Sequence, residues 1–166
     1  MNRYDNENGI TMNFVSCAMV AGTTSTYTTT VTTNAAIKGK FTTALTAQTN
    51  TATPTTDAVT SAAFVPLTAN QATVLVFGLN AAGAIQMMQG SIVPTETGVT
   101  TTAGAFINAP QFPVIPDTVV PLAYCLVRTS PTGSSFTAGT TSWTASGITT
   151  STFQNVATLP ERPQIA

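Results

Sequence analysis

The stretch PQFPVIPDTVVPLAYCLVRT, residues 110–129, combines an apolar, β-forming composition with four prolines. Each proline fixes φ and lacks an N–H donor, so residues 110–116 are not expected to form a helix or a central strand. An extended segment along a sheet edge or a neighbouring surface suits them better. Residues 118–129 are expected to continue as a strand, with Pro121 near its start or at a bulge.

The strand over residues 118–129 is predicted to be buried on both faces. Successive side chains along a strand point to opposite faces. One face then carries Leu122, Tyr124, Leu126 and Arg128, and the other carries Ala123, Cys125 and Val127. Both sets are largely apolar, which is typical of a strand that is covered on both sides.

A β-hairpin is predicted upstream of this strand. ATVLVFGLN (72–80) and AIQMMQGSIV (84–93) are β-forming runs, and NAAG (80–83) between them fits a turn, because Gly83 tolerates φ > 0. Met87 and Met88 are adjacent, so they must point to opposite faces, and at least one of them faces a core or an interface.

The N-terminal part is also expected to form strands. TYTTTVTT (26–33) and AIKGKFTTALTA (36–47) alternate loosely, the second with threonine on one side and Ile37, Phe41 or Leu45 on the other. QTNTATPTTD (48–57) is expected to be a loop because its residues are small and polar. Lys38 and Lys40 are expected to be solvated, to guard a sheet edge, or to pair with a partner's carboxylates.

The fold class that follows is all-β, a β-sandwich or jelly-roll-like domain. Residues 134–153 add one or two short strands, and no stretch shows a helical period with caps. We expect a flexible N-terminal arm over residues 1–15. A single β-sandwich domain with an extended C-terminal tail then covers residues 16–166.

Composition indicates an uncharged surface. The chain has 166 residues and a net charge of −1, only 7% of its residues are charged, and threonine supplies about a fifth of it. No basic patch suggests a nucleic-acid partner, and no segment is convincing as a membrane span or a signal peptide. Weak electrostatic self-repulsion indicates a protein that normally belongs to an assembly.

The residues needed for catalysis are scarce. The chain has no histidine, and its six carboxylates form no tight motif; no nucleotide-binding fingerprint is present. We therefore expect no enzymatic activity, no cofactor and no metal site. Cys17 and Cys125 are expected to be buried hydrophobes, although a bridge between them stays open. Tyr124, Phe136, Trp143 and Phe153 form either a sugar-stacking platform or, more simply, a core or an oligomer seam.

GLNAAGAIQMMQGSIV (78–93) followed by NAPQFPVIPDTVVPLAYCLVRT (108–129) resembles virion surface proteins of tailed bacteriophages. In that group a Gly-Leu-Asn/Asp-x-x-Gly hairpin precedes a Pro-x-Ile-Pro segment and a Pro-Leu-Ala-Tyr-like strand. The resemblance covers roughly residues 72–129 and, more weakly, the tail to residue 162. The chain looks like capsid decoration (cement) and head-fibre proteins, which are commonly β-rich and often trimeric. It implies a homotrimer that is made in the bacterial cytoplasm and binds the major capsid protein on the virion surface.

The proline-rich segment is the predicted contact region. We expect it to form a stiff bridge at a subunit or capsid boundary, through Pro110, Phe112, Pro113, Ile115, Pro116, Pro121 and Tyr124. Three alternatives remain: a tail-fibre or adhesin-type module that binds host-surface glycans, a surface-layer or fimbrial subunit, and, more remotely, an enzyme.

Overall fold

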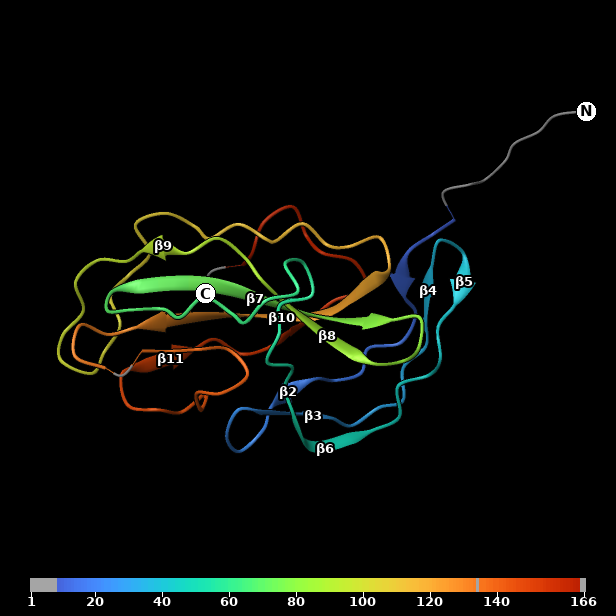
Figure 1. Ribbon diagram of the computed structural model, residues 1–166, viewed down its shortest axis with the longest axis horizontal. Helices are drawn as coiled ribbons and strands as arrows, with labels where there is room; N and C mark the ends of the chain where they lie inside the picture. The colour runs from blue at the N-terminus through green and yellow to red at the C-terminus, as the bar shows by residue number, and fades with distance from the viewer. Residues whose placement is uncertain (1–8, 134, 165–166) are drawn as a thin grey trace, which may run out of the picture.

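The computed structural model describes residues 9–133 and 135–164, which form twelve β-strands and no α-helix (Figure 1). The strands belong to three antiparallel sheets. The all-β class predicted from the β-branched composition is therefore confirmed.

The largest sheet is built around two long strands, β7 (Gln71–Asn80) and β10 (Val119–Thr129), which pair antiparallel in the middle of the molecule (Figure 1). The other edge of β7 pairs with β8 (Ile85–Gln89) and β9 (Val93–Pro94). The other edge of β10 pairs with β11 (Ile148–Thr150) and β12 (Gln154–Asn155). Both central strands are thus hydrogen-bonded on each side.

The predicted hairpin is present as β7 and β8. The side-chain Oδ1 of Asn80 accepts hydrogen bonds from the backbone N–H groups of Ala82 and Ala84, both at 3.0 Å. Gly83 has φ +80°, in the left-handed region that glycine tolerates best. Met87 and Met88 are both buried, and they belong to different cores on the two faces of the sheet, as their adjacent positions predict.

Pro121 lies at a β-bulge. The register of β10 on β7 shifts between Pro121, which is opposite Gly78, and Ala123, which is opposite Phe77. The prediction that Pro121 lies at a bulge or near the start of the strand is confirmed. The assignment of Leu122 to the face of Tyr124 was wrong, because the extra residue at the bulge turns Leu122 into the opposite core.

The first core lies between the large sheet and a second sheet, made of β2 (Val20–Ala21), β3 (Thr26–Thr29) and β6 (Gln48–Ala52). The expected loop over residues 48–57 was wrong for its first part, because residues 48–52 form β6, in which Gln48, Thr51 and Ala52 pair with β3. Two threonines of β6 sit among polar neighbours, so the sequence shows no apolar alternation there.

Aromatic rings fill the middle of the first core. The rings of Trp143 and Phe153 meet edge-on at 5.7 Å, and Phe77 lies 5.2 Å from Phe153. Trp143 Nε1 donates a hydrogen bond to the backbone oxygen of Thr26 at 2.7 Å, which ties the segment after residue 134 to β3. Tyr124, Phe136, Trp143 and Phe153 are all buried. Their interpretation as packing residues is confirmed, and a sugar platform made from these four rings is excluded.

The second core lies on the opposite face of the large sheet. Its buried residues are Val74, Val76, Met88, Val119, Tyr124 and Leu126. Partly buried residues of the proline-rich segment and of the C-terminal segment pack against them, namely Phe106, Phe112, Ile115, Val156 and Leu159. In Figure 1 these two segments run along the side of the large sheet that faces away from β2, β3 and β6. The sheet is therefore covered on one face by strands and on the other by extended chain.

The third sheet lies at one end of the molecule (Figure 1) and comprises β1 (Met12–Asn13), β4 (Ala35–Ile37) and β5 (Lys40–Phe41). Of the arm expected over residues 1–15, residues 1–8 lie outside the described residues. Asn13 is buried, and it accepts a hydrogen bond from Thr33 Oγ1 at 2.6 Å. The end of the expected arm is thus part of a sheet, while the division of the chain at residue 15 stays a prediction.

Cys17 and Cys125 are both free and buried in the first core. The alternative of a bridge between them was wrong. Burial raises the pKa of both thiols, since a thiolate loses its hydration in an apolar core. Both thiols therefore stay protonated in the folded protein at pH values where exposed thiols ionise.

We expect the free energy of unfolding to fall as pH rises above about 9. The unfolded chain then releases thiol protons that the folded chain retains, which favours unfolding by up to about 1.4 kcal/mol per pH unit and per thiol. Urea unfolding of the wild type and of Cys125→Ala at pH 8, 9 and 10 measures this effect. The variant should show a shallower decline, and an identical decline in both proteins would contradict the expectation.

Candidate functional site

The seven residues predicted to contact a partner are distributed between the core and the surface. Three of them are buried, namely Pro110, Pro121 and Tyr124, and four are half-buried, namely Phe112, Pro113, Ile115 and Pro116. Phe112 meets Tyr124 edge-on with 5.0 Å between ring centroids. The structure thus places the proline-rich segment against its own sheet, and contact of these residues with a partner stays a prediction.

The side chains that are most exposed in and near the proline-rich segment are not among these seven residues. Val114 is 82% exposed, and Ile107 is also exposed. Phe112 and Ile115, three residues apart, pack against the second core. This spacing matches the repeat of about three residues of a polyproline II helix, which turns the intervening Val114 outward. The spacing of the prolines in the sequence could have predicted that Val114 is exposed, because it indicates a three-residue repeat. The two-residue alternation of a strand does not predict it.

A second group of exposed apolar side chains lies on the third sheet. Phe41 is 78% exposed and Phe14 is 48% exposed, and their ring centroids are 5.7 Å apart. Ile10, just before β1, is exposed as well, and its backbone oxygen accepts a hydrogen bond from Gly39 N at 3.0 Å. We call Ile10, Phe14 and Phe41 the exposed sheet face. Contiguous exposed apolar groups of this kind mark interaction surfaces more often than isolated ones do.

The position of Phe41 differs from the sequence prediction, which put it on the same side as Ile37. Lys38 and Gly39 have φ +49° and +76°, a two-residue turn that pairs Ile37 with Lys40 and Ala36 with Phe41. Directly opposed residues share a face. Phe41 therefore shares the face of Ala36, the one opposite to that of Ile37, and it projects into solvent while Ile37 packs in the core.

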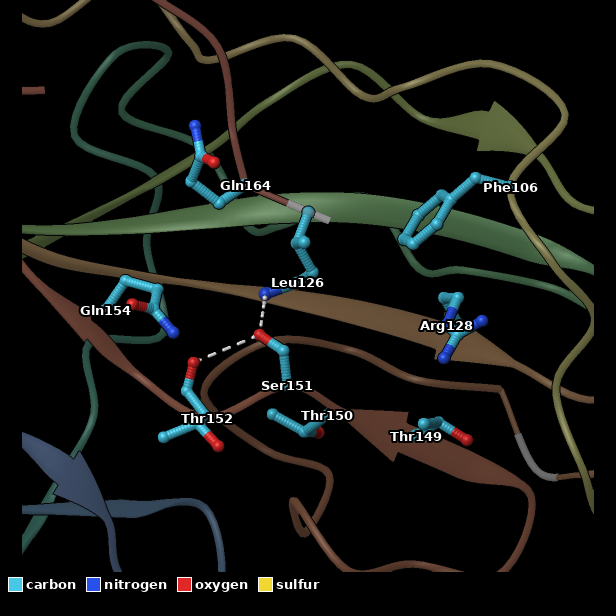
Figure 2. Close-up of a pocket in the computed structure, with 9 residues that line it drawn as sticks. All are labelled: Phe106, Leu126, Arg128, Thr149, Thr150, Ser151, Thr152, Gln154 and Gln164. Carbon is cyan, nitrogen blue, oxygen red and sulfur yellow. Dashed lines mark hydrogen bonds between the residues drawn. The ribbon is translucent and has the colours of Figure 1, made fainter. Parts of the chain in front are cut away.

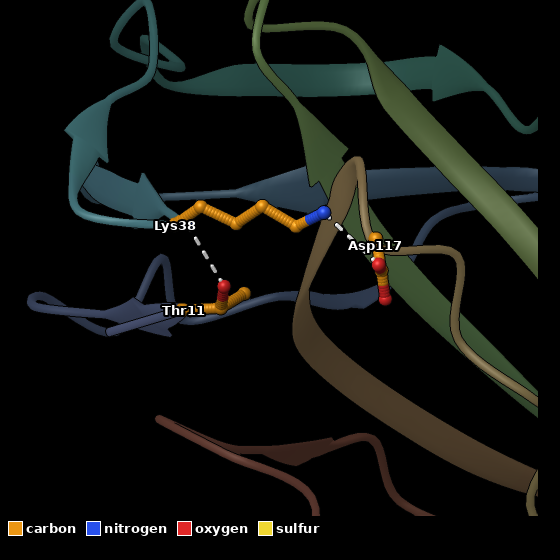
Figure 3. Close-up of polar contacts among 3 residues, drawn as sticks. All are labelled: Thr11, Lys38 and Asp117. Carbon is orange, nitrogen blue, oxygen red and sulfur yellow. Dashed lines mark hydrogen bonds and ion pairs between the residues drawn. The ribbon is translucent and has the colours of Figure 1, made fainter. Parts of the chain in front are cut away.

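The turn between β4 and β5 lies beside the end of the proline-rich segment. Lys38 Nζ is 3.0 Å from Asp117 Oδ2, and the backbone N–H of Lys38 donates to Thr11 Oγ1, also at 3.0 Å (Figure 3). Lys38 thus pairs within its own chain rather than only with solvent. Both charged side chains are largely exposed, so this ion pair contributes little stability and mainly marks where the two elements meet.

The large sheet also carries a pocket of about 320 Å³ beside β10 and β11 (Figure 2). Leu126 and Arg128 of β10 line it, together with residues 149–152 and 154. Phe106 and Gln164 close it on the other side. The guanidinium carbon of Arg128 lies 5.0 Å from the centre of the Phe106 ring, and its Nη1 donates to the backbone oxygen of Gly104 at 2.9 Å.

Two features are absent from residues 9–133 and 135–164. These residues contain no group of three or more histidine, cysteine or acidic side chains placed to hold a metal ion. In the same part of the chain, no helix is long and apolar enough to cross a membrane.

No protein-family model matches the chain, and neither does any curated protein or solved structure. The class that the fold itself defines is an all-β protein of three antiparallel sheets.

Proposed function

We propose that this protein is a structural virion protein of a tailed bacteriophage, a capsid decoration or cement protein. It is made in the bacterial cytoplasm and binds the assembled lattice of the major capsid protein on the surface of the virion. It forms a homotrimer there. Its β-sandwich, jelly-roll-like body acts as a rigid support for the surfaces that adhere.

The observation that carries this proposal is the exposed sheet face. Phe14 and Phe41 expose aromatic rings that contact each other at one end of the molecule. Aromatic side chains are enriched in the buried centres of protein interfaces, because they remove a large apolar area from water. A surface of this composition favours a protein partner over nucleic acid, whose phosphates require cations.

The edge of the third sheet supports adhesion to a lattice. β5 is the outer strand of the order β1-β4-β5, and no further strand of the described chain pairs with its outer edge. An extended segment of a capsid subunit can add to such an edge through main-chain hydrogen bonds, which need no ionic groups. Binding to the assembled shell but not to free subunits stabilises the shell by mass action.

The proline-rich segment supports the same function through rigidity. Its residues Phe112 and Ile115 are anchored on the second core, while Val114 is exposed. A segment that is already ordered loses little conformational entropy when it docks. Three copies around an axis would bury exposed apolar side chains such as Val114 that one chain leaves in water.

Replacing both Pro113 and Pro116 with glycine should weaken attachment more than it weakens the fold. Each substitution adds backbone freedom to the unfolded chain and costs about 0.4–1 kcal/mol of stability. The loosened segment presents Val114 less rigidly, so trimer formation or particle occupancy should fall. Light scattering after size exclusion, with quantified occupancy on particles, measures both. A double variant with wild-type oligomeric state and occupancy would count against this role.

Electron microscopy of the native particle tests the proposed function. The density of this chain should lie on the outer surface of the head, in contact with the major capsid protein, with three copies around each binding position. Density confined to the tail, or a purified particle that lacks the chain, would overturn the proposal.

A further inference from the structure

Arg128 brings a positive charge to the pocket beside β10 and β11 (Figure 2). Within the described part of the chain, no carboxylate oxygen lies within 4.0 Å of its guanidinium. The group is nevertheless held in place, by the face of the Phe106 ring and by its hydrogen bond to Gly104. A half-buried guanidinium gives up part of its hydration, which a hydrogen-bonded anion can replace. The guanidinium N–H groups of Arg128 that do not bond to Gly104 are available to an anion.

The charge of the pocket matches a carboxylate. Among the described residues that line it, Arg128 is the only charged one, so this lining carries one positive charge and no negative one. A guanidinium fork matches the two oxygens of a carboxylate in geometry as well as in charge. A phosphate dianion would need a second cation, which the residues that line this pocket do not supply.

The other polar groups of the pocket are neutral donors and acceptors. Six side chains carry them, namely Thr149, Thr150, Ser151, Thr152, Gln154 and Gln164. Ser151 Oγ accepts from the backbone N–H of Leu126, and Thr150 Oγ1 donates to the backbone oxygen of Trp143. In the described chain, the side chains of Thr149 and Gln154 make no hydrogen bond, so their capacity remains for a ligand with several hydroxyl groups.

We propose that this pocket binds an acidic saccharide, a sugar unit with a carboxylate such as a uronic acid. The carboxylate pairs with Arg128, the sugar hydroxyls bond to the ring of hydroxyl and amide groups, and the apolar sugar face contacts Leu126 and Phe106. The volume of about 320 Å³ lies at the lower end of small-molecule sites, which suits one sugar unit. An acidic peptide is a poorer fit, because it offers the neutral side chains only its main-chain groups, whereas a sugar unit offers several hydroxyl groups that both donate and accept.

This inference goes beyond attachment to a capsid and is tested on the isolated protein. Nuclear magnetic resonance titration of the ¹⁵N-labelled protein compares three probes: glucuronate, glucose and acetate. Glucose lacks only the carboxylate, and acetate lacks only the sugar. We expect glucuronate to shift the amide signals of residues 149–154 and to bind about tenfold or more tightly than either control probe, because a charge-assisted pair adds to the neutral bonds.

Three variants locate the binding. Arg128→Gln should reduce glucuronate affinity about tenfold or more, to that of glucose. Lys38→Gln removes a cation outside the pocket and should leave glucuronate binding unchanged. If Arg128→Gln does not fold, Gln154→Ala serves instead, because Gln154 is exposed. Gln154→Ala should weaken glucuronate binding and leave acetate binding unchanged.

The proposal is overturned if glucuronate and glucose shift the same signals with equal affinity, or if the shifts lie outside the pocket. It also fails if an aspartate-containing peptide binds the pocket more tightly than glucuronate. These results leave the position of the chain on the particle untouched, so they are distinguishable from a failure of the decoration function.

Discussion

Trp143→Ala is expected to lower the free energy of unfolding by about 4 kcal/mol, within the range for buried aromatic residues. The side chain is almost fully buried among Phe77, Phe136 and Phe153. Its removal leaves a cavity between the large sheet and the β2-β3-β6 sheet, which these rings otherwise fill. Small domains are stable by only about 5–15 kcal/mol, so this variant should be close to unfolding at ambient temperature.

A matched variant separates packing from hydrogen bonding. Trp143→Phe keeps an aromatic ring in place but loses the indole N–H that donates to Thr26 O, together with part of the volume of the indole. That oxygen also accepts from the backbone N–H of Gly22 at 2.8 Å, so it keeps a partner. We therefore expect Trp143→Phe to cost about 2 kcal/mol, for the lost hydrogen bond and the smaller ring, which is clearly less than Trp143→Ala. Urea denaturation measures both variants, and equal losses in the two would contradict the packing role of the ring.

The central strands of the fold could be predicted because their sequences are far more apolar than the threonine-rich segments on either side of them. The long apolar runs of β7 and β10, and the Asn80–Gly83 turn, require no knowledge of distant partners. Pro121 predicts an interruption of pairing for a local reason, the missing N–H. The bulge places Leu122 in the other core. Strict alternation of side chains cannot predict this position, because the place of the extra residue in a bulge depends on the partner strand.

The periphery of the fold could not be predicted in the same way. Threonine dominates both strands and loops there, so β6 looks like the loops around it. Phe41 carries an apolar side chain that sequence reasoning assigns to a core. Only the turn at Lys38 and Gly39 decides that it faces solvent. The exposed sheet face was therefore missed, although it carries the proposed function.

Replacing both Phe14 and Phe41 with serine is expected to remove most of the affinity for capsid shells. Both rings are exposed in the isolated chain, so the free energy of unfolding should change by about 1 kcal/mol or less. If both rings become buried against a partner, their loss costs about 2–4 kcal/mol of binding, which corresponds to about thirtyfold or more in affinity. Val65→Ser with Val99→Ser is the matched control, because these two exposed valines lie outside the exposed sheet face.

The most direct test of adhesion through this uncharged surface is co-sedimentation of the purified protein with assembled capsid shells. Dissociated major capsid protein serves as the comparison. We predict saturable binding to shells, little binding to free subunits, a large loss for the double phenylalanine variant, and wild-type binding for the double valine variant. Equal binding of the wild type and the phenylalanine variant, or no binding of the wild type to shells, would contradict the account.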